Sequence, residues 1–363
     1  MLKFIKKGAR RRIVILACAC LPMVLALSGC QTIRFYSQAV AGQYEILAHQ
    51  KPIAKLIDNP ATDPKLKAKL ELVLKLRQFA EQELNLRPDG SYLRYADLHR
   101  EFVVWNVNVA PALSLDPKTW WFPIVGAASY RGYFSETAAR RYAAIWEEKG
   151  WDTYIGDVPT YSTLGWFRDP LLNTFIFESE ADLAETIFHE LTHKRLFVVG
   201  DTDFNEALAT TVSQEGVRRW FQAEHNTLGR EEYEKSIRHD DDFVKLVMIG
   251  RNELEKVYAD AGLPEADKLR RKAEVIAHMR ADYAELKKKW GVSKSGYDDW
   301  FEEPINNAKL NTIAAYYDLV PAFEAVLRAQ DGNLEKFFQA VADLAKAPLE
   351  KRHEALGAYL NAK

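Results

Sequence analysis

Two histidines four residues apart, His189 and His193, constrain the fold of this chain more than any other feature. Side chains four positions apart share one face of a helix, so both imidazoles can reach the same ion. Glu190 follows the first histidine and can hold a water beside that ion or take its proton. The stretch 189–193 therefore predicts a helix that carries most of a zinc site. The plain alternative is a surface helix that happens to carry two histidines.

A catalytic zinc ion usually has three protein ligands and one open position, so this motif needs a third ligand. Glu206 is the first candidate, because a helix that follows a short loop can return a carboxylate to the two histidines. Asp201 and Asp203 are alternatives, and either could instead orient a histidine without touching the metal.

The two stretches together, His-Glu-x-x-His at 189–193 and Asn-Glu-x-x-Ala at 205–209, resemble the gluzincin metallopeptidases, which include zinc aminopeptidases. The resemblance implies that His189, His193 and Glu206 bind zinc and that Glu190 is the general base. Only twelve residues separate His193 from Glu206, fewer than in the loop common among gluzincins. The segments 121–126, 130–134, 161–166 and 306–308 further resemble a bacterial family named putative aminopeptidases, and this resemblance spans nearly the whole mature chain.

The first thirty residues have the pattern of a secretion signal. A basic start precedes an apolar run, Ile13 to Leu27, that is shorter than the about 20 residues of a membrane span. Leu27-Ser28-Gly29-Cys30 resembles the lipobox of bacterial lipoproteins, in which the chain is cut before the cysteine and the cysteine is lipidated. The alternative is a transmembrane anchor with an incidental cysteine. Because Gln31 is not the Asp that retains such lipoproteins at the inner membrane, the resemblance implies an outer-membrane protein that faces the periplasm.

Composition excludes several classes of function. All three cysteines, Cys18, Cys20 and Cys30, lie in this first segment, so disulfides, thiolate zinc sites and cysteine nucleophiles are excluded from the body. Lys and Arg total 49 against 51 Asp and Glu, and no basic run interleaved with aromatic residues appears, so we expect no nucleic-acid partner. There is no Gly-rich phosphate loop and no Gly-x-Ser-x-Gly elbow for nucleotide or serine chemistry.

Periodicity predicts helices at both ends of the body and strands in its middle. The stretch 33–86 is helical and ends in a turn at 87–90. Strands are predicted at 102–109 and 120–134, as part of a small antiparallel sheet, with further strands at 152–165 and 172–177. The predicted later helices are 135–149, 179–196, 205–220, 231–261, 264–290, 306–329 and 333–360, with 231–261 and 264–290 forming a protruding hairpin.

These elements predict an α+β fold that is predominantly α-helical, with a small antiparallel sheet packed beside a zinc-binding helix pair. The expected segments are a lipoprotein signal peptide at 1–29, an N-terminal helical segment at 30–100, a sheet plus zinc-helix core at 101–220 and a C-terminal helical region at 221–363.

Cleavage of a peptide bond by water requires a donor for the oxygen that becomes negative. Tyrosine commonly has that role in related enzymes, and the candidates are Tyr133, Tyr161, Tyr316 and Tyr317.

An aminopeptidase also needs a carboxylate for the substrate ammonium. Glu185, one helical turn before His189, and Glu178 and Glu180 near the helix start could serve, although carboxylates at a helix start often only favour the helix dipole. Arg131 could bind a peptide carbonyl or carboxylate, or form a structural ion pair. A sheet edge could accept an extended peptide by strand addition.

The sequence therefore predicts a zinc-dependent metallopeptidase with a peptide substrate, most simply an aminopeptidase. A zinc endopeptidase and a non-catalytic envelope protein that binds peptides are the alternatives. A cavity with a carboxylate close to the metal would favour the aminopeptidase, whereas a groove open on both sides would favour the endopeptidase.

Overall fold

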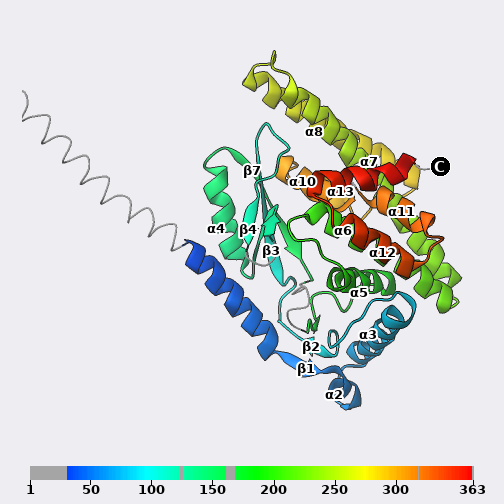
Figure 1. Cartoon of the computed structure of the whole chain (residues 1–363). Coiled ribbons are helices and arrows are strands. Elements are labelled where there is room, and N and C mark those ends of the chain that lie inside the picture. Colours follow the sequence, from blue (N-terminus) through cyan, green and yellow to red (C-terminus); the bar gives the residue numbers. More distant parts are fainter. Residues whose placement is uncertain (1–30, 123–125, 161–167, 318, 362–363) are drawn as a thin grey trace, which may run out of the picture.

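The computed structural model describes residues 31–122, 126–160, 168–317 and 319–361, without the side chains of 315–317 and 361. Within this part, helices surround a small β-sheet (Figure 1), which confirms the predominantly helical α+β class. Cys30 and the expected signal peptide lie outside the described residues. None of the helices described is both long enough and apolar enough to cross a membrane.

The N-terminal part contains strands that the sequence did not reveal. Residues 31–48 are helical, followed by β1 (Gln50–Pro52), α2 (Ile53–Asp58) and α3 (Pro64–Glu83). β1 pairs antiparallel with β2 (Arg94–Ala96), which pairs in parallel with β8 (Leu171–Leu172). The helical pattern predicted for 33–86 is therefore wrong at β1, because pairing with β2 and not local periodicity makes this segment extended. The strand predicted at 172–177 is reduced to β8, with turns after it.

The main sheet is antiparallel and has β3 (Val104–Pro111) between β6 (Tyr130–Tyr133) and β7 (Trp151–Val158). Side chains alternate across β3. Trp105, Val107 and Val109 lie in an apolar cluster with Ala139 and Ala143 of α4 (Glu136–Glu147), whereas Val104 and Asn106 line a cavity on the other face.

The strand predicted over 120–134 is divided. β4 (Trp120–Phe122) and β5 (Gly126–Ala128) form a separate hairpin, and only β6 joins the main sheet.

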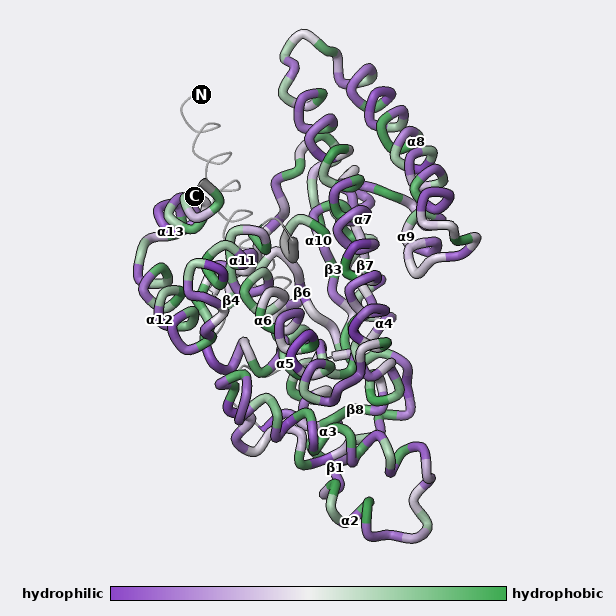
Figure 2. Tube along the Cα trace, turned by 90° about the vertical axis from the view of Figure 1, so that its right-hand side faces the viewer, coloured by the Kyte–Doolittle hydropathy of each residue, from purple (hydrophilic) through white to green (hydrophobic). Residues whose placement is uncertain are grey.

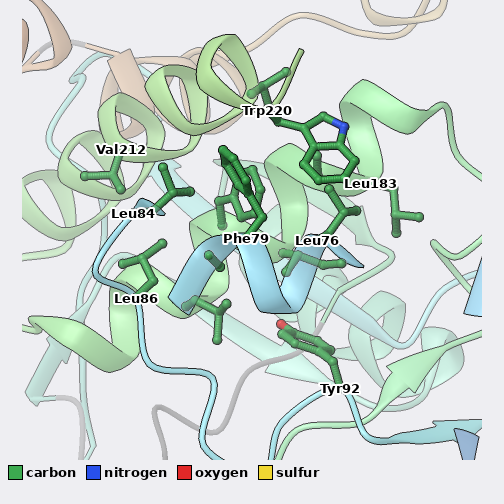
Figure 3. Close-up of a cluster of buried hydrophobic side chains, with 14 of the residues drawn as sticks. Leu76, Phe79, Leu84, Leu86, Tyr92, Leu183, Val212 and Trp220 are labelled. Atoms are coloured by element: carbon green, nitrogen blue, oxygen red, sulfur yellow. The ribbon is translucent and has the colours of Figure 1, made fainter. Parts of the chain in front are cut away.

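Two neighbouring helices form the centre of the molecule, α5 (Glu180–Arg195) and α6 (Thr202–Ala223). Gly216 of α6 permits their close approach, because a Cβ atom there would lie 2.7 Å from the ring of Phe188. Below them, Phe79 of α3 packs edge-on against Trp220 at 5.2 Å (Figure 3). The same core includes Phe323, so the three segments predicted for residues 30–100, 101–220 and 221–363 all contribute to one hydrophobic core.

The C-terminal region contains the predicted hairpin, in which α7 (Thr227–Ala259) packs on α8 (Glu265–Trp290) around a second apolar cluster. The hairpin extends from the body (Figures 1 and 2). α9 (Asp298–Glu302), α10 (Asn307–Tyr317), α11 (Val320–Ala329), α12 (Leu334–Leu344), α13 (Leu349–Ala358) and a short 3-10 turn (Tyr359–Asn361) complete the described chain. The helix predicted at 306–329 is thus two helices, with Pro321 in the first turn of α11, where proline needs no N–H partner.

Candidate metal centre and its cavity

Helix α5 faces the core on one side and a cavity on the other. Leu183, Ile187 and Leu191 are fully buried in the core, as the sequence periodicity predicts. Ser179 starts the helix by accepting a hydrogen bond from the Asp182 N–H at 3.1 Å. The opposite face of α5 lines a cavity of about 640 Å³.

The structure brings His189, His193 and Glu206 together at this cavity. The two Nε2 atoms are 3.2 Å apart, and Glu206 Oε2 lies 3.1 Å from His189 Nε2 and 3.6 Å from His193 Nε2. Tetrahedral zinc with ligands at about 2.0–2.1 Å separates its ligand atoms by about 3.3 Å. The donor set and spacing therefore fit zinc. Among the described residues, this is the one group of three or more histidine, cysteine and acidic side chains that could hold a metal.

Asn205 explains how twelve residues suffice to bring Glu206 back to the histidines. Its side-chain oxygen accepts from the Val198 N–H, and its Nδ2 donates to the Val198 carbonyl, both at 2.8 Å. These two hydrogen bonds hold the connecting loop against the first turn of α6. The role of Asn205 was missed from the sequence, although it directly precedes Glu206.

Asp201, which the sequence offered as an alternative ligand, instead makes structural contacts. It caps α6 by accepting from the Phe204 N–H at 3.2 Å and pairs with Arg352 and His353 of α13. Asp203 lines a neighbouring cavity. Neither belongs to the three-residue group, so Glu206 is the better candidate ligand.

Charges around the three side chains are strongly coupled. Burial alone would raise the pKa of Glu206, but His193 and His189 hold it far below its usual range. Burial alone would lower the pKa of His193, and the Glu206 carboxylate raises it instead. Burial raises the pKa of Glu190, with Glu206 and Asp169 adding to the effect and the two imidazoles opposing it. Glu190 therefore keeps its proton to a higher pH than an exposed carboxylate does.

Of the four tyrosines predicted as donors, only Tyr133 has a described side chain, and that side chain is not at this site. Tyr133 is buried on the other face of β6, where its ring packs on Phe35 at 5.5 Å. Tyr161 lies outside the described residues, as do the side chains of Tyr316 and Tyr317. Instead, Tyr130 lines the cavity.

Burial raises the pKa of Tyr130, and the nearby Glu206 and Glu190 raise it further, so its hydroxyl stays protonated. Tyr130 and Gly132 line the cavity together because side chains alternate along β6, but the sequence does not show which face of the strand meets the cavity.

Carboxylates line one side of the cavity. Glu178, Asp182 and Glu185 all face it, whereas Glu180 accepts a hydrogen bond from the Trp220 indole at 2.8 Å and is not among the cavity residues. Burial, together with Asp182, raises the pKa of Glu178 to about 7. Burial also raises the pKa of Glu185 to about 7, although the Tyr233 hydroxyl donates to Glu185 at 2.8 Å and opposes the shift.

A second cavity of about 300 Å³ adjoins the first on the side of Tyr130. Asn106, Tyr130, Val158 and Thr202 line both. The space beside the candidate metal centre therefore continues past Tyr130 into the second cavity. Its carboxylates, which we call the acidic wall, are Glu178 just before α5 and Asp182 and Glu185 on α5.

Arg131 lines neither of these two cavities. Its guanidinium lies over the rings of Phe35 and Tyr142, 4.0 and 4.6 Å from their centroids. The edge of β6 is also partly occupied, because Gln38 of the N-terminal helix accepts from the Phe134 N–H at 2.7 Å. Neither Arg131 nor this point of the sheet edge is placed to bind a peptide.

The acidic stretch around His239 has structural contacts. The His239 ring stacks on Trp290 at 4.3 Å, and Asp242 accepts from the Trp290 indole at 2.9 Å. Asp240 accepts from the Tyr297 hydroxyl. These contacts join α7 to the end of α8 and to the segment that follows it.

Two helices that bring two histidines and a carboxylate to one cavity define a candidate divalent-metal centre. Comparison with family models gives the family: the model described as "Putative aminopeptidase" matches residues 34–356, and the chain belongs to this family. The family description indicates peptidase activity. Curated proteins and solved structures gave no match.

Proposed function

We propose that this protein is a zinc aminopeptidase of the bacterial cell envelope. The observation that carries the proposal is the position of Glu185, one helical turn from His189, in the same cavity as the candidate metal ligands. Side chains four apart on a helix have Cβ atoms about 6 Å apart. The α-amine of an N-terminal residue is only two bonds from its carbonyl carbon, so a carboxylate one helical turn from a metal ligand could bind the amine while the metal contacts the carbonyl.

His189, His193 and Glu206 would hold the metal, which when bound lowers the pKa of a water and polarises a carbonyl. Glu190 would take the proton from the attacking water and deliver it to the leaving amine. Its buried position suits this exchange, because a raised pKa makes the carboxylate a better proton acceptor. Tyr130 would donate a hydrogen bond to the substrate oxygen as negative charge develops there.

The acidic wall would bind the substrate ammonium. Glu178, Asp182 and Glu185 face a cavity that also holds the candidate metal centre, and an ammonium placed among them regains the charge contacts that it loses with water. The residues that follow the cleaved bond would extend past Tyr130 into the second cavity. An endopeptidase would have no use for a carboxylate wall so close to the reacting bond.

We also propose that lipid at Cys30 anchors the protein to the outer membrane, facing the periplasm. The lipobox-like stretch Leu27–Cys30, the short apolar run before it and Gln31 after it support this location.

Digestion of a peptide library by the purified protein tests the function, with mass spectrometry as the readout. Loss of single N-terminal residues, abolished by chelator and restored by zinc, is expected. A matched library with acetylated N-termini should be resistant, and the Glu190→Gln variant should bind zinc but cleave neither library. Internal cleavage would favour the endopeptidase. Zinc binding without any cleavage by the unaltered protein would favour a non-catalytic peptide-binding protein.

A further inference from the structure

The N-terminal helix, residues 31–48, has two apolar faces. One face packs on the body: Phe35, Gly42 and Ile46 are buried, and the Phe35 ring contacts Tyr133 and Phe122 at 5.5 and 5.8 Å. Glycine is required at 42, since a Cβ atom there would lie 2.1 Å from the Phe134 ring. This face is the ordinary contact of an amphipathic helix with a sheet.

The other face is an exposed apolar stripe, between 42% and 72% exposed, made of Ile33, Tyr36, Val40, Tyr44 and Leu47. These positions recur every three or four residues, so at 100° per residue they fall within about 80° of one another around the helix. The stripe runs along about 21 Å of the helix. Arg34 and Glu45 are the only charged residues between 31 and 48. Both lie about a quarter turn from the edge of the stripe, where Glu45 pairs with Arg100 of the body at 3.0 Å.

An apolar stripe of this length on the outside of a soluble body needs an occupant. Cys30, the lipid acceptor in the proposed function on which this inference rests, directly precedes residue 31, the first described residue of the helix. Acyl chains on that residue would hold the start of the stripe at the bilayer surface. Tyrosine is enriched at this boundary, because its ring is apolar and its hydroxyl remains in the headgroup region.

We propose that the stripe lies flat in the headgroup region of the membrane and turns the protein into one fixed orientation. The helix, not only the lipid, then forms the membrane-binding surface. The sheet would then lie between the N-terminal helix and the cavity. Tyr133 of β6 contacts Phe35 of the helix, whereas Tyr130 of the same strand lines the cavity on the opposite face. The cavity would therefore lie on the side of the sheet that is away from the bilayer.

The test uses the full chain, expressed and processed in a bacterial host and inserted into phosphatidylethanolamine–phosphatidylglycerol vesicles. Since the described body has no cysteine, Val40→Cys adds a single labelling site for an environment-sensitive fluorophore. Leu228→Cys on α7 is the matched control, because Leu228 is 74% exposed and Val40 is 70% exposed. The unaltered chain should take no label, and the mass of its N-terminal peptide tests lipidation at Cys30 separately.

The label at position 40 should shift its emission to the blue, lose intensity to nitroxide lipids and resist iodide, whereas the label at 228 should respond only to iodide. Adding Tyr44→Asp should reduce the shift at position 40. Quenching by iodide at position 40 to the same extent as at 228 would overturn the proposal, because the stripe would then lie in water. Protection from both iodide and nitroxide lipids would also overturn it, since a protein surface, such as a second copy, would then cover the stripe.

Discussion

The replacement Glu185→Gln removes one negative charge from the acidic wall and leaves the shape of the side chain intact. Glutamine can still accept the hydrogen bond that the Tyr233 hydroxyl donates to Glu185. At an effective dielectric constant of about 20, a carboxylate and an ammonium about 4 Å apart attract by about 4 kcal/mol. Asp182 and Glu178 remain in the cavity and offset part of the loss.

We therefore expect a net loss of about 1.5–3 kcal/mol of transition-state stabilisation, the range for a hydrogen bond to a charged group. This corresponds to a fall in kcat/KM of about 10- to 100-fold. The assay is hydrolysis of a free dipeptide amide at about pH 7.5, above the pKa of about 7 that burial gives to Glu185 and below the pKa of about 7.7–8.0 of an α-amino group. Hydrolysis of the same compound with an acetylated N-terminus measures the background, which should not change.

Glu180→Gln is the control, because Glu180 belongs to the same helix but bonds to the Trp220 indole outside the cavity. Its kcat/KM should stay close to that of the unaltered protein. The assignment of the acidic wall would be refuted if Glu185→Gln cleaved free peptides as fast as the Glu180→Gln control. The assignment would equally be refuted if Glu185→Gln lowered the hydrolysis of the acetylated substrate and of the free substrate to the same extent.

Three further variants test other parts of the site. Glu190→Gln should lower kcat by about 10²–10⁴-fold without loss of thermal stability or zinc content, because burial already disfavours the charge. Tyr130→Phe should lower kcat by about 10²–10³-fold with little change in KM, and Tyr133→Phe should leave kcat unchanged. His353→Ala should lower the free energy of unfolding by about 1.5 kcal/mol near pH 6, measured by urea denaturation. Asp201 raises the pKa of His353 and its own pKa is lowered in turn, so this contribution is lost as the pH rises through the raised value or falls through the lowered one.

Each of these predictions has a contrary result. Substantial cleavage by Glu190→Gln would remove Glu190 from the proton transfer. Equal losses in Tyr130→Phe and Tyr133→Phe would indicate a fold defect and not a donor at position 130. A stability difference for His353→Ala that is as large at pH 9 as at pH 6 would mean that packing, not the charge pair with Asp201, connects α13 to the loop.

Local features of the site were accessible from the sequence. His189 and His193 lie on one face because helix geometry alone sets the relation of positions four apart. The Ser179 cap and the buried line of Leu183 and Ile187 follow from neighbours within one or two turns. For the same reason the predominantly helical class could be predicted correctly.

Features that depend on distant pairing could not be predicted. The three-residue strand β1 follows a helical pattern, and only its partner β2, more than forty positions later, makes it extended. The choice of Tyr130 over Tyr133 depends on which face of β6 meets the cavity, and a shift of one residue in register reverses every side chain.

The sequence by itself determined the helix, its two histidines, the adjacent Glu190 and the acidic side chains in reach of them, since all lie within a few turns of one helix. Only the tertiary structure decided the third side chain of the group. Asn205 holds the loop so that Glu206 meets the imidazoles, while α13 engages Asp201. Loop closure and helix packing are long-range effects, and no local pattern in the chain encodes their outcome.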